Sequence, residues 1–493
     1  MALVAAMLVG MALVVAPGPA TGTSVLVQKD LGAGPISSDN VTYHGTIPID
    51  SPGVGGEVVV RPDLGGKKFF YVTGGKGLSI YDVTDPAVPV LAGTFPFAHV
   101  QNEDVKVSDD GKTVVIAADG SLLVPANPVT TGITLIDVTD PLLPEIVASN
   151  NDRVMGRGTA AGIAEHTAEC ANADCSVIYG RTGRIYKVDF EAGTVPEIGF
   201  WNRGINGENI GGIHALNRDE TGLVIADSNP RLILDPGVMD AEATPEQPKV
   251  LAQGARSNKD NRLQHNNVRT DAADWVPRIP PEDPEEEEII PTAVAGQDFQ
   301  VSPRSTSIVE ERAIMQPGEL VLGNSESNLN TNCSAAGGLS TWSIVNFDRE
   351  DVTGIQQLEV FRPLNGSGTD GSPPVNALGC SGHWFTENDG FVAASWYEHG
   401  VRFFDIDKTV GTIKEVGYFQ PVATEAGAAH WIDDSFVYSV DYARGIDIVS
   451  FDREAEPASQ QELDASWLAN LDAVGAFSTL ERYACNRAGV SVA

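Results

Sequence analysis

Basic residues are scarce in this sequence, and their scarcity argues against nucleic acid and anionic membranes as binding partners. The 493 residues include 32 Lys and Arg against 67 Asp and Glu, which gives a formal net charge of −35. Binding to nucleic acid or to an anionic membrane surface needs clustered Lys and Arg that neutralise phosphates. We therefore expect no nucleic-acid partner. The negative net charge is typical of a secreted protein that charge repulsion keeps in solution. It is also compatible with calcium or a cationic ligand as a partner.

Long apolar runs are missing beyond the N-terminus. Residues Met1 to Ala16 are almost wholly apolar and are followed by Pro17-Gly18-Pro19-Ala20. A short apolar run that ends in small residues is typical of a signal peptide, so residues 1–20 are predicted to be one, with cleavage after Ala20. A retained membrane anchor is the alternative, but the run is short for a full span. We expect a secreted or cell-surface protein that does not contact the membrane after cleavage.

Cysteine is also rare, and its five copies cannot all pair with one another. Cys170 and Cys175 are close enough in sequence to close a small loop, and Cys333 and Cys380 form the second natural pair, which leaves Cys485 over. Disulfides fit an exported protein. A metal site on cysteines is the competing interpretation, but the spacing matches no Cys-x-x-Cys motif.

Sequence motifs that carry well-known chemistry give no support for two further functions. The chain has no Gly-x-Ser-x-Gly and no phosphate-binding loop, and no dinucleotide fingerprint accompanies its histidines. Acyl transfer through a serine nucleophile and nucleotide chemistry are therefore poorly supported.

A strand-and-turn repeat is the clearest feature that is present. The stretch Gly77 to Pro86 returns as Gly132 to Pro141, and the central aspartates Asp82 and Asp137 are 137 − 82 = 55 residues apart. Each copy is a run of apolar and β-branched residues followed by a turn that Asp-Pro ends. A repeat of this length, made of strands and turns, is typical of a propeller blade.

Weaker copies of the same unit extend the count to seven. We predict an all-β fold, a seven-bladed β-propeller over residues 40–454, closed by an N-terminal strand at Val41 to Pro48 that completes the last blade. An insert loop at 275–316 interrupts blade 5, and its acidic stretch Pro280 to Glu288 is too polar to pack, so it is predicted to be exposed, with calcium as a candidate ligand. The tail 455–493 has helical spacing of apolar residues and is predicted to place one helix outside the propeller.

The repeated motif resembles that of the LVIVD-repeat β-propeller family. The shared features are an initial glycine, an alternating apolar strand, Asp-Val-Thr-Asp-Pro and a second proline, and they are clear in the first two blades and degenerate in the other five. Asp82, Asp137, Asp189 and Asp405 match the motif aspartate, whereas the seventh blade has Ser450 near that place. The resemblance implies a secreted or surface propeller and little about its chemistry.

Histidines are few, and most of them fall at one place in the repeat. Among the eight, five stand at or just before the first strand of a blade, and a sixth, His99, stands in the loop that enters blade 2. First strands surround the axis of a propeller, so their entry loops open at one mouth of the channel. The six predicted to share this mouth as candidate metal ligands are His99, His166, His214, His265, His383 and His430.

Two interpretations of these histidines stay open. Converging neutral imidazoles suit a transition metal such as Zn, Cu or Fe. Alternatively, each histidine braces its blade by a hydrogen bond to an aspartate in a neighbouring turn, for which Asp119, Asp227 and Asp441 are available. The residues predicted to line the same mouth and bind a ligand are Glu57, Glu103, Asp104, Trp384 and Trp431.

The sequence therefore predicts an exported propeller that binds a ligand or partner at a histidine-rich channel mouth. The partner would be a small molecule, a metal or an extracellular protein, and we expect the propeller to work as a monomer. The alternative function is that of a transition-metal-dependent enzyme, an oxidase or a lyase or hydrolase, with axial histidine ligands.

Overall fold

The structure is a computed structural model, and it describes most of the chain between residues 23 and 473. The described ranges are 23–24, 35–48, 53–74, 77–96, 105–119, 131–210, 214–228, 230–254, 263–276, 278, 289–296, 299–326, 337–345, 354–364, 381–421, 424–442 and 444–473. The predicted signal peptide and the acidic stretch Pro280 to Glu288 lie outside these residues.

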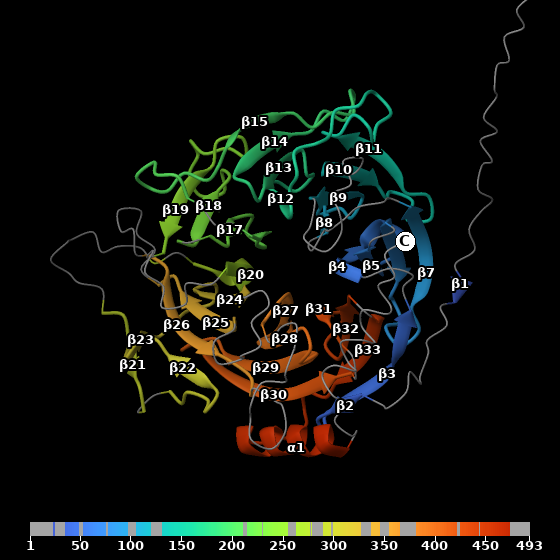
Figure 1. Cartoon of the computed structure of the whole chain (residues 1–493). Coiled ribbons are helices and arrows are strands. Elements are labelled where there is room, and N and C mark those ends of the chain that lie inside the picture. Colours follow the sequence, from blue (N-terminus) through green and yellow to red (C-terminus); the bar gives the residue numbers. More distant parts are fainter. Residues whose placement is uncertain are drawn as a thin grey trace, which may run out of the picture.

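Seven antiparallel sheets stand around one axis as the blades of a propeller (Figure 1). Blades 1 to 3 consist of β4 (Gly53–Arg61), β5 (Lys67–Gly74), β6 (Gly77–Asp82) and β7 (Val90–Pro96); β8 (Lys106–Val107), β9 (Thr113–Ala118), β10 (Gly132–Asp137) and β11 (Glu145–Ser149); and β12 (Ala168–Cys170), β13 (Val177–Gly180), β14 (Arg184–Lys187) and β15 (Glu197–Phe200). Blades 4 and 5 consist of β16 (Leu216–Arg218), β17 (Val224–Ala226), β18 (Leu232–Asp235) and β19 (Lys249–Gln253); and β20 (Leu263–Arg269), β24 (Leu320–Glu326), β25 (Leu339–Ser343) and β26 (Gln356–Phe361). Blades 6 and 7 consist of β27 (Phe385–Asn388), β28 (Phe391–Ser395), β29 (Val401–Asp407) and β30 (Thr412–Gln420); and β31 (Ala426–Trp431), β32 (Phe436–Asp441), β33 (Gly445–Phe451) and β3 (Val41–Pro48).

The ring is closed by the N-terminal strand, as the sequence predicts. Strand β3 is the outer strand of blade 7 and pairs antiparallel with β33, with Val41 opposite Phe451 and Pro48 opposite Gly445. Ile47 of β3 is 1% exposed and packs in the core between blades 7 and 1. Closure by a strand from the other end of the chain leaves no open joint between the first and last blades.

The hydrophobic core lies between the blades. Each of seven buried clusters joins two neighbouring sheets, and together they run round the ring. In β9, Val114 and Ile116 pack toward blade 1, whereas Val115 and Ala117 pack toward blade 3. Successive side chains of a strand point to opposite faces, so a strand buried on both faces must be apolar throughout, as β9 is.

The turns of the repeat are held by its aspartates. In blade 1, Asp82 Oδ1 accepts hydrogen bonds from the backbone N–H of Thr84 at 3.1 Å and from its hydroxyl at 2.6 Å. In blade 2, Asp137 Oδ1 accepts from the backbone N–H of Thr139 at 2.7 Å. An Asp side chain that bonds the backbone two residues on is a turn former, which explains why Asp-x-Thr ends both strands.

Short additional strands extend the outer edges of three blades. β1 (Thr23–Ser24) pairs with β7, β2 (Ile36–Ser37) pairs with β30, and β22 (Ser305–Ser307) pairs with β26. β21 (Thr292–Val294) and β23 (Glu311–Ala313) form a sheet of their own. The second half of the insert 275–316 therefore contains strands and is not simply an exposed loop. It carries buried apolar side chains such as Ala293 and Phe299.

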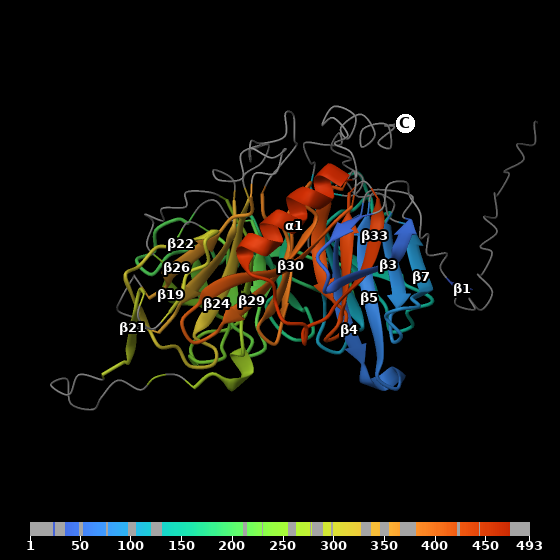
Figure 2. The ribbon, with the colours of Figure 1, turned by 90° about the horizontal axis from the view of Figure 1, so that it is seen from below.

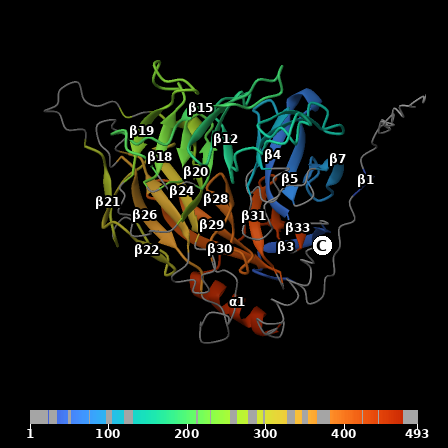
Figure 3. The same ribbon diagram turned by 45° about the horizontal axis from the view of Figure 1, so that its top comes forward.

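One α-helix follows the propeller and lies outside the ring, as predicted (Figures 2 and 3). α1 (Gln460–Ala473) buries Leu463 and Trp467 against Ile36 and Tyr418 of the outer strands β2 and β30. The described residues also include two 3-10 turns, η1 (Pro62–Leu64) and η2 (Ala272–Asp274). Within the described residues, no helix combines the length and the apolarity that a membrane span requires.

Candidate metal centre at the propeller axis

Consecutive blades place a histidine near the start of the inner strand. His166, His214 and His383 each stand two residues before β12, β16 and β27, and His265 lies near the start of β20. Inner strands of a propeller run side by side around the axis, so equivalent positions come to the same height. Blades 3 to 6 therefore direct four imidazoles to one part of the channel.

The four imidazoles form a contiguous row, which we call the histidine arc (His166, His214, His265 and His383). The ring centroids are 4.7 Å apart from His166 to His214, 4.2 Å from His214 to His265, and 4.0 Å from His265 to His383. His265 and His383 have no exposed surface, and His214 is 5% exposed. The predicted convergence is thus observed for four of the five predicted histidines that the structure describes.

A carboxylate from blade 5 joins the arc. Glu326, the last residue of β24, is 4% exposed, and its Oε2 lies 3.9 Å from Nε2 of His265. One ligand atom from each of His214, His265 and Glu326 lies within 4.8 Å of the others. The other oxygen of Glu326, Oε1, accepts a hydrogen bond of 2.5 Å from the hydroxyl of Tyr397.

These three residues could hold a metal ion. Around an ion with bonds of about 2.0–2.1 Å in tetrahedral geometry, neighbouring ligand atoms are about 3.3 Å apart. The 3.9 Å between His265 and Glu326 is longer than this by about half an ångström, which a small side-chain rotation can close. Two imidazoles and one carboxylate suit a borderline transition metal better than calcium, which prefers oxygen ligands.

The outer members of the arc are held by hydrogen bonds of their own. Nδ1 of His166 lies 2.9 Å from Oδ2 of Asp119, which follows β9 in blade 2. Nδ1–H of His383 donates to the carbonyl oxygen of Gly427 in blade 7. The bracing interpretation therefore fits His166. Asp227 pairs with Arg231 at 2.7 Å and also interacts electrostatically with His265, and Asp441 accepts from Thr424 at 2.6 Å.

A network of polar and aromatic side chains lies next to the arc. Lys106 of β8 pairs with Glu169 of β12 at 3.0 Å and donates to Asn217 of β16 at 2.6 Å. Asn217 in turn donates to Asn266 of β20 at 2.8 Å, and the ammonium of Lys106 lies 5.7 Å from the ring centroid of Trp384. Blades 2 to 6 thus each contribute one side chain to this network.

His430 lies apart from the arc. Its ring centroid is 5.3 Å from that of Phe70, and it is 2% exposed within the inner strand β31. Burial, and secondarily the charge of Lys106, lowers the pKa of His430 to about 3. At the height of His383, blade 7 instead presents Gly427, whose carbonyl oxygen accepts from both His383 and Trp384.

The other predicted mouth residues have different surroundings. Trp384 is buried next to His265, with ring centroids 5.8 Å apart, whereas Trp431 packs against Phe403 and Phe451 between blades 6 and 7. Glu57 is half-buried on β4, where it pairs with Tyr71. The remaining predicted residues, His99, Glu103 and Asp104, lie outside the described part of the chain.

Sequence reasoning missed two members of the centre, Glu326 and Tyr397. Glu326 ends a strand that carries the buried polar run Asn324, Ser325 and Glu326. Buried polar groups need partners, so such a run at the end of an otherwise apolar strand is a signal that points to a polar site. Tyr397 had no such signal, because it belongs to a turn in another blade.

Two of the five cysteines lie in blade 3. Cys170 and Cys175 are joined by a disulfide, as their spacing predicts. Cys333 and Cys380 lie outside the described residues, so their pairing stays a prediction.

Comparison with known proteins assigns neither a family nor a function to the chain. No family profile matches the chain, and no curated protein matches it. Among solved structures, a putative 6-phosphogluconolactonase from Bacteroides uniformis is similar at 9% identity and a TM-score of 0.45, covering 84% of this chain and 96% of its own. The β-propeller domain of Cps50 (Swd1) from Myceliophteria thermophila is similar at 12% identity and a TM-score of 0.47, covering 84% and 100%. Likenesses this distant carry no functional argument, so the seven-bladed ring rests on its own strand order.

Proposed function

We propose that this protein is an exported β-propeller that binds a transition metal at its channel mouth through His214, His265 and Glu326, and that the metal centre binds a ligand there. The observation that carries the proposal is the convergence of three buried donor atoms within 4.8 Å. Buried donors that are brought together from two neighbouring blades are unusual unless they bind something.

The donor set supports Zn, Cu or Fe as the metal. Neutral imidazole suits all three, and the carboxylate adds the negative charge that a buried divalent cation requires. Because His214, His265 and Glu326 are buried, a bound metal ion would exchange slowly with the solvent. Their burial therefore favours tight binding over weak binding at the surface.

Export and family membership belong to the same proposal. The disulfide Cys170–Cys175 supports an oxidising compartment. The apolar N-terminus supports a signal peptide, and the Asp-Val-Thr-Asp-Pro motifs of blades 1 and 2 support membership of the LVIVD-repeat propellers.

A metal-dependent enzyme is the second candidate. Two imidazoles and one carboxylate leave coordination positions open, as in catalytic rather than closed structural sites. Such a centre supplies Lewis-acid or redox chemistry when it is loaded. The test is an assay for hydrolysis of an ester, peptide or phosphoester and for consumption of oxygen. An activity that a chelator removes and that Glu326→Gln lacks would establish this candidate.

Metal titration tests the primary proposal. The protein is stripped with a chelator and titrated with Zn²⁺, Cu²⁺ and Co²⁺, followed by calorimetry and elemental analysis. We expect about one equivalent bound by the wild type, and an affinity lower by 10–100-fold or more in His265→Gln and in Glu326→Gln. His44→Gln is the matched control, because His44 bonds Ser450 on β33 instead of joining the arc.

A metal ion that binds the folded state must stabilise it and raise its melting temperature. Uptake of less than about 0.1 equivalent, with the same melting temperature before and after the metal is added, would remove the metal centre.

A further inference from the structure

A tight turn connects β28 to β29 and carries Tyr397 to the metal centre. The backbone N–H of Trp396 donates to the carbonyl of Gly400 at 2.7 Å, and the N–H of Gly400 donates to the carbonyl of Tyr397 at 3.0 Å. Tyr397 has a φ of 43°, in the left-handed region that a bulky side chain seldom adopts. Such a conformation persists only where its surroundings impose it, and it is found most often at binding sites.

The turn aims the hydroxyl of Tyr397 at one oxygen of Glu326. The hydroxyl donates to Oε1 at 2.5 Å, and this leaves Oε2 facing Nε2 of His265 at 3.9 Å. The ring of Tyr397 is also 4.8 Å from that of His383, so it lies directly beside the histidine arc. A hydrogen bond to the second oxygen of a ligating carboxylate fixes which oxygen meets the metal.

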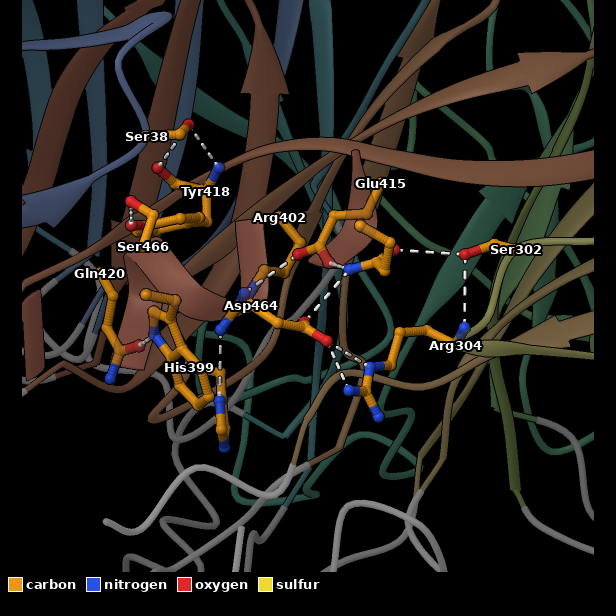
Figure 4. A network of polar contacts seen from close by, with 12 residues as sticks. Ser38, Ser302, Arg304, His399, Arg402, Glu415, Tyr418, Gln420, Asp464 and Ser466 are labelled. Atoms are coloured by element: carbon orange, nitrogen blue, oxygen red, sulfur yellow. Dashed lines mark hydrogen bonds and ion pairs between the residues drawn. The ribbon is translucent and has the colours of Figure 1, made fainter. Parts of the chain in front are cut away.

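The C-terminal helix supports the turn from its other side. The side-chain amide of Gln420 donates to the carbonyl of Glu398 at 2.9 Å, and the indole N–H of Trp467 donates to Gln420 Oε1 at 2.7 Å. The ring of Trp467 lies 5.3 Å from that of His399. Figure 4 shows Gln420 and His399 together where the helix meets the propeller.

The helix is itself anchored by charged side chains of two blades. Arg304, which precedes β22 in the insert of blade 5, pairs with Asp464, and Nε of Arg304 is 2.9 Å from Oδ2 (Figure 4). Glu415 of β30 accepts from Gln460 at 2.6 Å and from Arg402 at 3.0 Å. A continuous series of hydrogen bonds and ring contacts thus connects α1, the turn at Tyr397 and Glu326.

We propose that Tyr397 is the positioning residue of the metal centre, and that α1 holds its turn in the conformation that presents Glu326 to the metal. The inference rests on the proposed metal site and extends it to a tyrosine and a helix that lie outside the ligand set. Release of the helix would loosen the turn and lower metal affinity, which makes the C-terminal tail a means of regulating the centre.

The direct test is Co²⁺ affinity in Tyr397→Phe, measured by calorimetry and by the visible absorption of the bound ion. The variant keeps the ring and removes only the hydroxyl. We expect an affinity lower by 10–100-fold and a changed Co²⁺ spectrum. Tyr179→Phe is the control, because the hydroxyl of Tyr179 donates to Pro245 at 2.8 Å in the interface of blades 3 and 4. It should keep the wild-type affinity.

A double variant separates positioning from general destabilisation. If Tyr397 acts through Glu326, Glu326→Gln combined with Tyr397→Phe loses no more affinity than Glu326→Gln alone. Unchanged affinity in Tyr397→Phe, or equal losses in Tyr397→Phe and Tyr179→Phe, would overturn the role of Tyr397. A wild type that binds no metal overturns the proposed function first, so the two failures are distinguishable.

Trp467→Phe tests the contribution of the helix. It keeps an aromatic ring at the interface and removes the N–H that donates to Gln420. We expect a loss of metal affinity of roughly 2- to 30-fold, as for couplings carried through intervening contacts. An affinity equal to that of the wild type would disprove the link between helix and centre.

Discussion

The Nδ1 atom of His166 and the Oδ2 atom of Asp119 lie 2.9 Å apart, and this hydrogen bond ties the inner strand of blade 3 to the end of β9 in blade 2. Its neighbour in the arc, His214, is grouped instead with His265 and Glu326. Bracing and metal binding need not be alternatives for the whole set: a carboxylate braces His166, whereas His214 and His265 belong to the proposed metal site.

This division predicts the effect of Asp119→Ala. The variant removes a largely buried partner of an imidazole, and we expect the free energy of unfolding to fall by about 1–2 kcal/mol. Metal stoichiometry should stay at one, because His166 is outside the proposed ligand set. Urea unfolding and metal titration of the same preparation check both statements, and loss of the metal would instead make His166 a ligand.

The buried His430 predicts an acid-sensitive contribution to stability. Burial and Lys106 lower the pKa of His430 to about 3, whereas the unfolded chain binds this proton below about pH 6.5. The unfolded state therefore holds more protons between these values, and stability falls as pH drops through the window, by up to about 1.4 kcal/mol per pH unit.

His430→Leu should remove this slope. Urea unfolding at several values between about pH 4 and 7 measures it. The variant should gain stability relative to the wild type as pH falls. His44→Leu, at a partly exposed site, serves as the comparison. If the stability difference between His430→Leu and the wild type did not change with pH, the histidine would not be buried as a neutral group.

A buried carboxyl group in blade 7 predicts the opposite trend. Burial, followed by the charges of Glu398 and Asp441, raises the pKa of Glu425 to about 9, whereas the unfolded chain loses this proton near pH 4.3. The folded state holds more protons between these values, so stability declines as pH rises from about 4.3 to 9.

Glu425→Gln should abolish that decline, and its stability relative to the wild type should increase from pH 5 to pH 8. The exposed Glu456 offers a matched control, and Glu456→Gln is measured over the same pH range. Parallel pH profiles for Glu425→Gln and the wild type would contradict the buried, protonated state.

The disulfide of blade 3 predicts a modest cost on removal. Cys170 and Cys175 close a short loop between β12 and β13, and Cys170→Ser with Cys175→Ser should lower the free energy of unfolding by about 2 kcal/mol.

Alkylation and mass spectrometry of the unreduced wild-type protein count the thiols of the other three cysteines. One free thiol, at Cys485, supports the predicted Cys333–Cys380 bond, and three free thiols disprove it.

The sequence by itself determined the architecture. Strand alternation, Asp-x-Thr turns and the 55-residue repeat are local properties, and they predict seven blades and the closing strand β3, which pairs with β33 as expected. The placement of histidines near inner-strand starts is equally local, and it predicted that six histidines converge. Four of these form the arc, His430 lies apart from it, and His99 is outside the described residues.

Tertiary structure alone decided which side chains meet. A strand rises about 3.3 Å per residue, so misplacing the start of an inner strand by three residues moves a side chain by about 10 Å along the axis. This is why Gly427, and not His430, stands beside His383. Glu326 and Tyr397 come from a second strand and from a turn of a different blade, and their contact at 2.5 Å depends on how twisted sheets pack, which no local pattern encodes.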